Sequence, residues 1–242
     1  MDQVADVQQA TEAFHSGGFF SNVITGIQDA YVRGDPWLFF ILTAAAFAVL
    51  FTVERIWRLY MQYSINGRSF MFEVEKYIKA NDLDGAIRVC NSSATASLPK
   101  VIKAGLLRAS RSEEQVQNAI DAASLEQIPK LERKLSYLAL IANIATLLGL
   151  LGTIAGLIRS FSAIGADIAD PSQRQAMLSA GIAEAMIATA LGLLTAIFAM
   201  IMHNILANKA TRITEEIDEY GVKLLDLLSA KRYRHTAESS GE

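Results

Sequence analysis

No charged residue interrupts LSYLALIANIATLLGLLGTIAGLI (residues 135 to 158), which lies between Lys134 and Arg159. Its 24 residues, at about 1.5 Å each in a helix, more than cover a hydrocarbon core of about 30 Å. A second apolar stretch, residues 181 to 208, has only Glu184 near its start and His203 near its end as ionisable groups. Both stretches are therefore predicted to span a membrane.

Small and polar residues gather on one side of each predicted helix when successive residues are placed about 100° apart. In the first helix these residues are Ala142, Ala145, Thr146, Gly149, Gly152, Thr153, Gly156 and Ser160. In the second they are Gly181, Glu184, Ala185, Ala188, Thr189, Gly192, Thr195, Ala196, Ala199 and His203. Large apolar residues occupy the opposite sides and can contact lipid. Each small side is therefore expected to face another helix at close approach, or a cavity.

Two interpretations of the small sides stay open at this point. Close helix packing alone accounts for the glycines and alanines. Glu184 favours an ion or substrate path, because a carboxylate inside an apolar span costs about 2.5 to 3.5 kcal/mol. Because Glu184 lies near the start of the apolar stretch, simple solvation at the level of the lipid headgroups is the alternative. Thr153 and Thr189 lie deeper, and the alternative for each is a hydroxyl bonded to its own helix.

A third apolar stretch, residues 37 to 53, comes first in the chain, with Trp37 and Trp57 as interfacial anchors. The mostly polar residues before it do not have the pattern of a cleaved signal peptide. Lys and Arg are concentrated in two of the four segments outside the spans. Residues 54 to 134 contain thirteen and residues 209 to 242 contain six, whereas residues 1 to 36 contain one and residues 159 to 180 contain two. The positive-inside rule then predicts a cytoplasmic second and fourth segment and an external first and third.

The segments between the spans also have a helical pattern. Residues 18 to 34 carry an apolar face typical of an amphipathic helix on a membrane surface or against a protein partner. Residues 54 to 134 predict several helices, with breaks or caps expected at Asn66–Gly67, Asn81 or Asp82, Ser97 before Pro99, Ser112 with Gln115, and Pro129. The sequence thus predicts an all-α integral membrane protein with three transmembrane helices extended into a cytoplasmic helical bundle.

After the last span, residues 209 to 242 predict a C-terminal helix followed by a polar tail. Apolar residues recur there at alternating spacings of four and three, at Ile213, Ile217, Tyr220, Leu224 and Leu227. This spacing is typical of a helix seam and permits a bundle of several copies. Residues 231 to 242 are polar and are expected to be unstructured.

Composition excludes several classes of function. A net charge of −3 argues against nucleic acid as a partner. The single cysteine, Cys90, excludes an internal disulfide and a multi-cysteine zinc site, and the three histidines have no metal-ligand spacing. No grouping of residues indicates a nucleophile or a cofactor site, so no enzyme activity, metal or cofactor is predicted. Only three spans and no inverted repeat weaken the case for a solute transporter.

The stretches GLLGTIAGLIRSF (149 to 161) and GIAEAMIATALGLLTAI (181 to 197) resemble the MotA/TolQ/ExbB proton-channel family. Three spans with the large loop between the first two resemble its TolQ and ExbB branch, and NDLDGAIRVC and KAGLLRAS are similar to segments of the family's cytoplasmic loop. The resemblance covers roughly residues 37 to 230. Ala180 and Phe198 stand where the family usually has prolines, so the kinks of those prolines are not assured here.

The resemblance implies an inner-membrane protein with a periplasmic N-terminus and a cytoplasmic C-terminus. It also implies a homo-pentamer whose second and third spans line a pore that holds a dimer of a single-span ExbD/TolR-like partner, which carries the proton-binding aspartate. Matching residues in this chain are Thr153, Thr189 and Glu184, and the other expected pore-lining residues are Thr146, Gly149, Gly156 and Thr195. Proton flow would then drive mechanical work of the partner. The rival hypothesis is a non-conducting structural scaffold.

Overall fold

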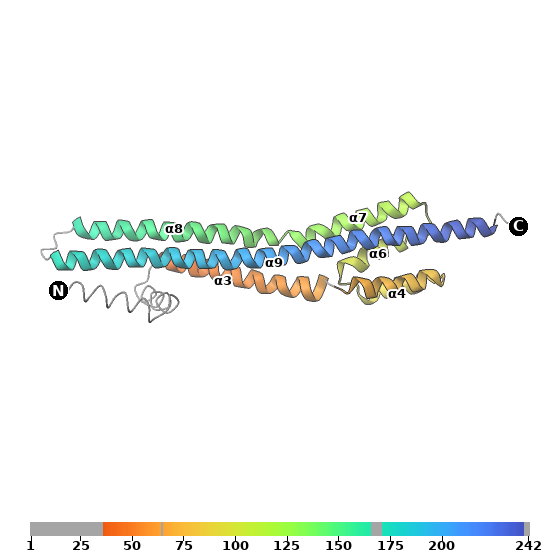
Figure 1. Cartoon of the computed structure of the whole chain (residues 1–242), viewed down its shortest axis with the longest axis horizontal. Helices are drawn as coiled ribbons and strands as arrows, with labels where there is room; N and C mark the ends of the chain where they lie inside the picture. The colour runs from red at the N-terminus through yellow and green to blue at the C-terminus, as the bar shows by residue number, and fades with distance from the viewer. Residues whose placement is uncertain (1–35, 64, 166–170, 240–242) are drawn as a thin grey trace, which may run out of the picture. The chain divides into compact units, whose positions relative to one another are not determined.

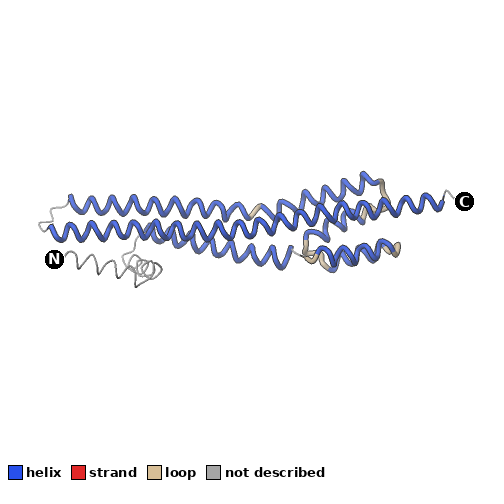
Figure 2. The backbone as a smooth tube through the Cα atoms, viewed as in Figure 1, coloured by secondary structure: helices blue, strands red, loops and turns tan. Residues whose placement is uncertain are grey.

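The computed structural model describes residues 36–63, 65–165 and 171–239, and the amphipathic helix expected over residues 18 to 34 lies outside them. The described residues are almost entirely helical and contain no strand (Figures 1 and 2). In chain order the elements are α3 (Pro36–Trp57), the π-helix η1 (Arg58–Tyr63), α4 (Gly67–Lys79), α5 (Leu83–Ser92), α6 (Ser97–Leu106), α7 (Glu113–Glu132), α8 (Leu135–Gly165) and α9 (Pro171–Ser239). The all-α prediction is confirmed.

Three of the described helices, α3, α8 and α9, contain segments long and apolar enough to cross a membrane, as predicted. The chain divides into two compact units. Unit 1 consists of residues up to Phe51 together with Tyr137–Met202, and unit 2 of Thr52–Ser136 together with the residues from His203 onward. Helix α9 is unbroken through Ala180 and Phe198, where the family usually has prolines.

Unit 1 places its small residues between helices and its large apolar residues outside. One buried cluster consists entirely of alanines: Ala48, Ala142, Ala145, Ala196 and Ala199. The large residues on the opposite side of α8 are exposed, as a lipid-facing surface requires: Leu140, Ile144, Leu147, Leu151, Ile154 and Ile158. On α9, Ile187 departs from the expected pattern, because it packs against a cluster containing Leu38 and Ile41 of α3. The predicted two-sided character of both helices is otherwise confirmed.

Most helix starts in unit 2 follow the predicted caps. The side chains of Asn66, Asp82 and Ser112 accept hydrogen bonds from backbone N–H groups at the starts of α4, α5 and α7. For α6 the predicted start at Ser97 is confirmed, but the predicted cap is wrong. Ser97 is the first residue of this helix, the preceding Ala96 makes no side-chain cap, and the helix ends at Leu106. Ser97 is fully buried, so its side chain belongs to the core of the unit and not to a solvent-exposed helix end.

The predicted seam on α9 is buried against helices of its own chain. Ile213, Ile217 and Leu224 are at most 3% exposed. Leu228 takes the buried place expected for Leu227, which is only half-buried. Gly105 of α6 lies so close to Leu224 that an added Cβ would be 2.8 Å from a methyl carbon of that leucine. In this chain the seam therefore holds unit 2 together.

The expectation of an unstructured tail from residue 231 is wrong over most of its length. Helix α9 continues to Ser239, and residues 240 to 242 lie outside the described part of the chain. Residues 230 to 234 include alanine, lysine and arginine, which have high helix propensity. They extend a helix that is already nucleated and packed, which needs no new nucleus.

A joint interrupts the chain between α7 and α8, close to Pro129, as predicted. Helix α7 ends at Glu132 and α8 begins at Leu135. The last carbonyls of a helix lack partners within the helix. Here the Lys130 carbonyl accepts a hydrogen bond at 3.3 Å from a terminal guanidinium nitrogen of Arg55, a residue only 2% exposed. Arg55 thus stabilises a helix end that lies 75 positions away in the sequence.

Cys90 is expected to resist alkylation at neutral pH while unit 2 is folded. The residue is 1% exposed, and burial raises the pKa of its thiol to about 11. Because the thiolate is the reactive form, both the lack of access and the raised pKa slow the reaction. Maleimide labelling at about pH 7 should be slow for the native chain and rapid in denaturant. A chain carrying Cys90→Ser with Ser92→Cys, whose new thiol is at an exposed position, should label rapidly without denaturant.

Protonation of Glu75 in acid is expected to reduce the stability of unit 2. Its carboxylate lies 2.7 Å from Lys79 and 3.5 Å from Lys223 of α9. The hydrogen bond from Lys79 lowers the pKa of Glu75 from its ordinary 4.5. This contribution is present above the unfolded-state pKa and is lost as the pH falls through the lower folded-state pKa. Both lysines are exposed, so it is worth no more than about 1 kcal/mol.

The matching measurement is the thermal midpoint of unfolding of Glu75→Gln and of the parent at about pH 7 and about pH 4. The variant should lose less stability between the two conditions than the parent. Glu73→Gln, an exposed position on the same helix, should retain the parent's pH dependence. Identical pH dependence of Glu75→Gln and the parent would show that the pairs with Lys79 and Lys223 contribute nothing.

Candidate functional site

The candidate site lies where the small sides of α8 and α9 meet in unit 1. A Cβ added to Gly192 would lie 2.7 Å from both the Ala145 carbonyl oxygen and the Gly149 Cα. A Cβ on Gly156 would lie 2.8 Å from the Ala185 Cβ. Because Gly192 faces backbone atoms, a side chain there cannot be accommodated by a rotamer change. The two helices therefore approach as closely as glycine permits, as in small-residue packing inside membranes.

Thr153 of α8 and Thr189 of α9 face each other at this contact. Their hydroxyl oxygens are within hydrogen-bonding distance of one another. The Thr153 hydroxyl also lies 3.2 Å from the Gly149 carbonyl and 3.4 Å from the Ala185 carbonyl. The Thr189 hydroxyl lies 3.2 Å from the same Gly149 carbonyl. Both threonines are half-buried. The sequence predicted that these two residues lie on the small sides of α8 and α9, and the structure places them in direct contact.

This arrangement has more acceptors than protons. Each hydroxyl carries one proton and two lone pairs, so two protons are shared among two hydroxyls and two carbonyls. Each proton can move between acceptors by rotation of its hydroxyl. Such a pair can accept a hydrogen bond from a protonated carboxyl group, and after rotation it can donate one to a carboxylate. The pair therefore suits a group that changes its protonation state.

The other predicted threonines bond to their own helices. Thr146 donates to the Ala142 carbonyl at 3.1 Å, and Thr195 donates to the Leu191 carbonyl at 2.9 Å. Both bonds follow the i−4 pattern of hydroxyls inside helices. The predicted glycines Gly149 and Gly156 lie at the α8–α9 contact itself. Thr146 and Thr195 are half-buried, and with the described residues neither forms a hydroxyl pair like that of Thr153 and Thr189.

Glu184 is paired with Arg159, which sequence reasoning treated only as a boundary of the second span. The Arg159 terminal nitrogen lies 3.5 Å from the Glu184 carboxylate, with side-chain exposures of 52% and 23% respectively. Arg159 ends the uncharged part of α8, and Glu184 lies near the start of the apolar part of α9. Two antiparallel helices joined by a short loop bring such positions together. Opposite charges at these two places were the signal that could have predicted the pair.

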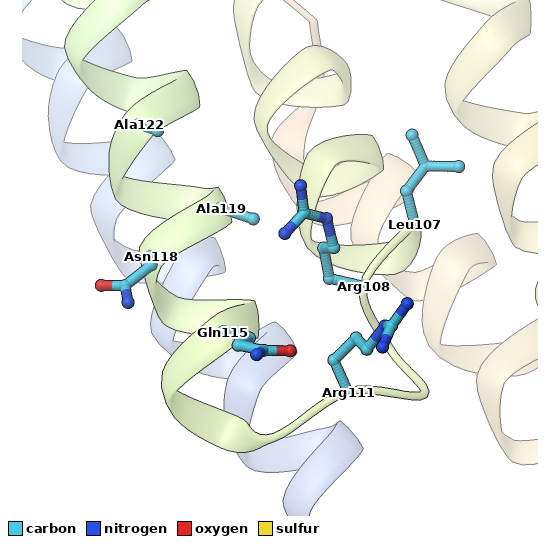
Figure 3. Close-up of a pocket in the computed structure, with 7 residues that line it drawn as sticks. All are labelled: Leu107, Arg108, Arg111, Gln115, Asn118, Ala119 and Ala122. Carbon is cyan, nitrogen blue, oxygen red and sulfur yellow. The ribbon is translucent and has the colours of Figure 1, made fainter.

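A separate pocket of about 620 Å³ lies in unit 2 between the end of α6 and the start of α7 (Figure 3). It is lined by Leu107, Arg108, Arg111, Gln115, Asn118, Ala119 and Ala122. The lining has no carboxylate, histidine or cysteine, so it offers neither a general base nor a nucleophile. Within the part of the chain that the structure describes, no group of histidine, cysteine, aspartate and glutamate side chains could hold a metal ion.

These features define a multi-pass membrane protein whose spans meet through a glycine-rich, hydroxyl-bearing surface. The model of the MotA/TolQ/ExbB proton channel family matches residues 93–219. The chain belongs to this family. It is an inner-membrane, multi-pass protein, and its family is one of channel and transport proteins, not of enzymes.

Individual relatives agree with this assignment. The chain is 28% identical over 184 residues to the ExbB-like 1 biopolymer transport protein of Synechocystis sp., covering 74% of this chain and 70% of the relative. It is 36% identical over 106 residues to the Tol-Pal system protein TolQ of Haemophilus influenzae, covering 42% and 45%. The structure of C. jejuni MotAB has the same fold, with a TM-score of 0.55 and 18% identity, over 93% of this chain and 92% of that one.

Proposed function

We propose that this chain is the proton-channel subunit of an energy-transducing complex, which couples the proton motive force to mechanical work of an ExbD/TolR-like single-span partner. The observation that carries the proposal is the hydroxyl pair of Thr153 and Thr189, held at the glycine contact of two membrane-spanning helices. Family membership supports the class of function. The work would be outer-membrane transport, envelope maintenance or motility.

In the proposed complex, five copies surround a dimer of the partner. The small sides of α8 and α9 line the pore, with Thr153 and Thr189 as the residues that meet the partner's carboxyl group. Gly149 and Gly156 let α8 and α9 approach closely enough to hold the two hydroxyls together, Thr146 and Thr195 add further polar groups, and Glu184 lies at the mouth of the path.

The proposed topology follows the distribution of basic residues. Residues 1 to 36 and 159 to 180 face the periplasm, and residues 54 to 134 and 209 to 242 face the cytoplasm. The helices of unit 2 are then cytoplasmic, and the Arg159–Glu184 pair lies at the periplasmic end of the spans. Protons entering from the periplasm would meet this pair before they reach the threonines.

The energy available fits a mechanical step. One proton moving through about 100 mV supplies about 2.3 kcal/mol. One or two protons can therefore shift an equilibrium between two arrangements that differ by a few kcal/mol. In each step the partner's carboxyl group would lose or gain its proton beside the hydroxyl pair. The change in charge would alter which hydrogen bonds it makes and so favour the other arrangement.

Proton flux into proteoliposomes tests the proposal against a non-conducting scaffold. A pH-sensitive dye inside the vesicles would report flux driven by a potassium diffusion potential. Vesicles containing this chain with its co-expressed single-span partner should conduct protons, and vesicles in which the partner's membrane aspartate is replaced by asparagine should not. Equal, negligible flux from both preparations would favour the scaffold, in which the small sides only pack helices together.

A further inference from the structure

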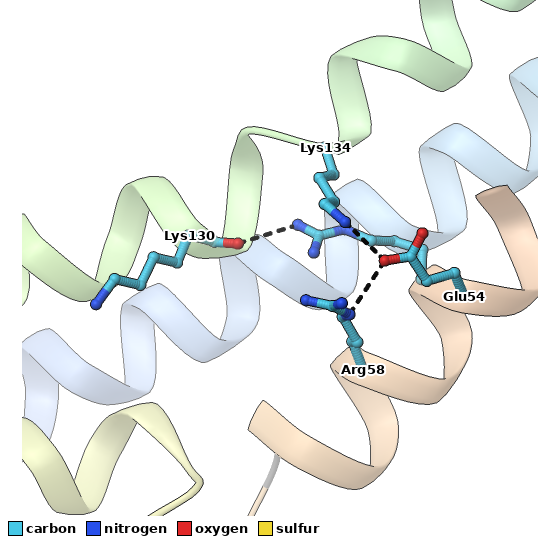
Figure 4. Close-up of polar contacts among 5 residues, drawn as sticks. Glu54, Arg58, Lys130 and Lys134 are labelled. Carbon is cyan, nitrogen blue, oxygen red and sulfur yellow. Dashed lines mark hydrogen bonds and ion pairs between the residues drawn. The ribbon is translucent and has the colours of Figure 1, made fainter.

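A cluster of basic side chains lies where the apolar part of α3 ends, within unit 2. One oxygen of the Glu54 carboxylate is 2.6 Å from the Lys134 ammonium and 3.1 Å from the Nε of Arg58 (Figure 4). Arg55 lies beside Glu54 in the sequence and is buried with its guanidinium on the Lys130 carbonyl. The Glu54 carboxylate thus pairs directly with two cations, Arg58 and Lys134, and a third cation, Arg55, is buried nearby.

The cluster carries an excess of positive charge. Arg58 and Lys134 contribute two positive charges against the one negative charge of Glu54. The Lys130 ammonium adds nothing to this excess, because it is paired with Glu126 at 2.7 Å. Such an excess favours an additional anion. The cluster directly follows the apolar part of α3. Residues at such a position lie at the depth of the lipid phosphates in a bilayer.

Arg58 offers the donors that such an anion needs. Its side chain is 43% exposed, and among the described residues its ion pair with Glu54 runs through Nε. Its two terminal nitrogens are further N–H donors beside this Nε contact. A guanidinium in this state can hold two oxygens of a phosphate in parallel hydrogen bonds. Lys134 is 39% exposed and supplies a second, more mobile donor.

A cavity beside Arg58 combines these donors with apolar walls. Its volume is about 390 Å³, and Val53, Glu54, Trp57 and Arg58 line it. Val53 and Trp57 are 57% and 66% exposed. A tryptophan at the end of a span is typical of the interface between acyl chains and headgroups. The cavity is thus apolar on the side that continues the span and cationic on the other, which is the polarity of a phospholipid where its glycerol joins its phosphate.

We propose that this cavity binds the headgroup of an anionic phospholipid. The phosphate is held by Arg58, Lys134 contributes a second charge, and the first carbons of an acyl chain lie along Val53 and Trp57. Glu54 opposes binding, because its carboxylate competes with the phosphate for both cations. The site is independent of proton conduction, so its test does not depend on the function proposed above.

Fluorescence quenching of Trp57 in reconstituted full-length protein tests the site. Trp37→Phe leaves Trp57 as the only tryptophan. Vesicles of phosphatidylcholine would contain either phosphatidylglycerol or phosphatidylcholine labelled with a nitroxide near the carbonyl end of an acyl chain. One favourable charge near the surface gives about 1 kcal/mol, so labelled phosphatidylglycerol should be preferred about fivefold. Equal quenching by the two labelled lipids would overturn the proposal.

Four variants assign the preference to this cavity. Arg58→Gln should reduce the ratio of the two quenching constants to about one, whereas Arg58→Lys should retain a part of the preference. Glu54→Gln should raise the ratio above the parent's, an increase that damage to the fold would not produce. Arg88→Gln removes an arginine that is 71% exposed and paired with Asp82 on α5, and it should leave the ratio unchanged. A preference that survives Arg58→Gln, or a fall with Glu54→Gln, would contradict the site.

Soluble glycerol phosphate, added in excess, distinguishes a lipid from a free phosphate compound. If the cavity binds a lipid, whose acyl chains add apolar contact, the soluble compound should not reduce the preference for labelled phosphatidylglycerol. Loss of the preference on its addition would show that the cavity takes soluble phosphates, and would overturn the assignment to a lipid.

Discussion

Replacing both Thr153 and Thr189 with valine is expected to reduce proton flux through the complex with its partner by about tenfold to a hundredfold. Valine keeps the shape of threonine and removes the hydroxyl. A hydrogen bond to an ionised group is worth about 1.5 to 3 kcal/mol, and each 1.4 kcal/mol is a factor of about ten. Each single change should have a smaller effect, because the remaining hydroxyl can still reach the Gly149 carbonyl and a facing carboxyl group.

Thr43→Val is the matched control for these substitutions. Thr43 lies on α3 and donates to the Phe39 carbonyl of its own helix at 2.7 Å. It has no hydroxyl partner on another helix among the described residues, so its replacement should leave the flux near that of the parent. Proteoliposome flux at matched protein content is the measurement. Undiminished flux in the double variant would show that Thr153 and Thr189 have no part in conduction.

Introducing a side chain at Gly192 is expected to separate α8 from α9. Its Cβ would lie 2.7 Å from two backbone atoms of α8, whereas a Cβ at Gly149 would lie no closer than 3.2 Å to any atom of α9. Overpacking of this kind costs about 1 to 3 kcal/mol, and here neither backbone can yield by a rotamer change. Gly192→Ala should therefore destabilise the protein more than Gly149→Ala, and Gly192→Val more than either.

Thermal unfolding in detergent, followed by circular dichroism, measures this ranking. Ala183→Val adds volume on the same helix at an exposed position and should leave the midpoint nearly unchanged. If Gly192→Val were as stable as the parent, α8 and α9 would not be in contact at this glycine. A separated contact should also reduce flux, since the two threonines depend on it to face each other.

Much of the fold could be predicted because it depends on local patterns. The uncharged length of residues 135 to 158 identifies a span without reference to any other part of the chain. The caps at Asp82 and Ser112 are formed within four residues. The small sides of α8 and α9 follow from helical geometry alone. These features need no knowledge of which helix packs against which.

The parts that were missed depend on contacts between distant residues. The bond from Arg55 to the Lys130 carbonyl joins positions 75 residues apart, and the pair of Lys134 with Glu54 joins positions 80 apart. Periodicity placed Thr153 and Thr189 on the correct sides but could not bring them into register with each other. The role of Ser97 in α6 was missed because a serine before a proline has the pattern of a cap, whereas here the serine is the first helical residue and is buried in the core.

Cross-linking at Thr189 tests most directly whether the small sides of α8 and α9 enclose a partner helix. In a Cys90→Ser background, Thr189→Cys would be compared with Met186→Cys, whose position on the same helix is 66% exposed. The co-expressed partner would carry one cysteine next to its membrane aspartate. The proposal predicts a disulfide between this chain and the partner at position 189 and none at 186. A cross-link at 186 alone, or none at either position, would contradict it.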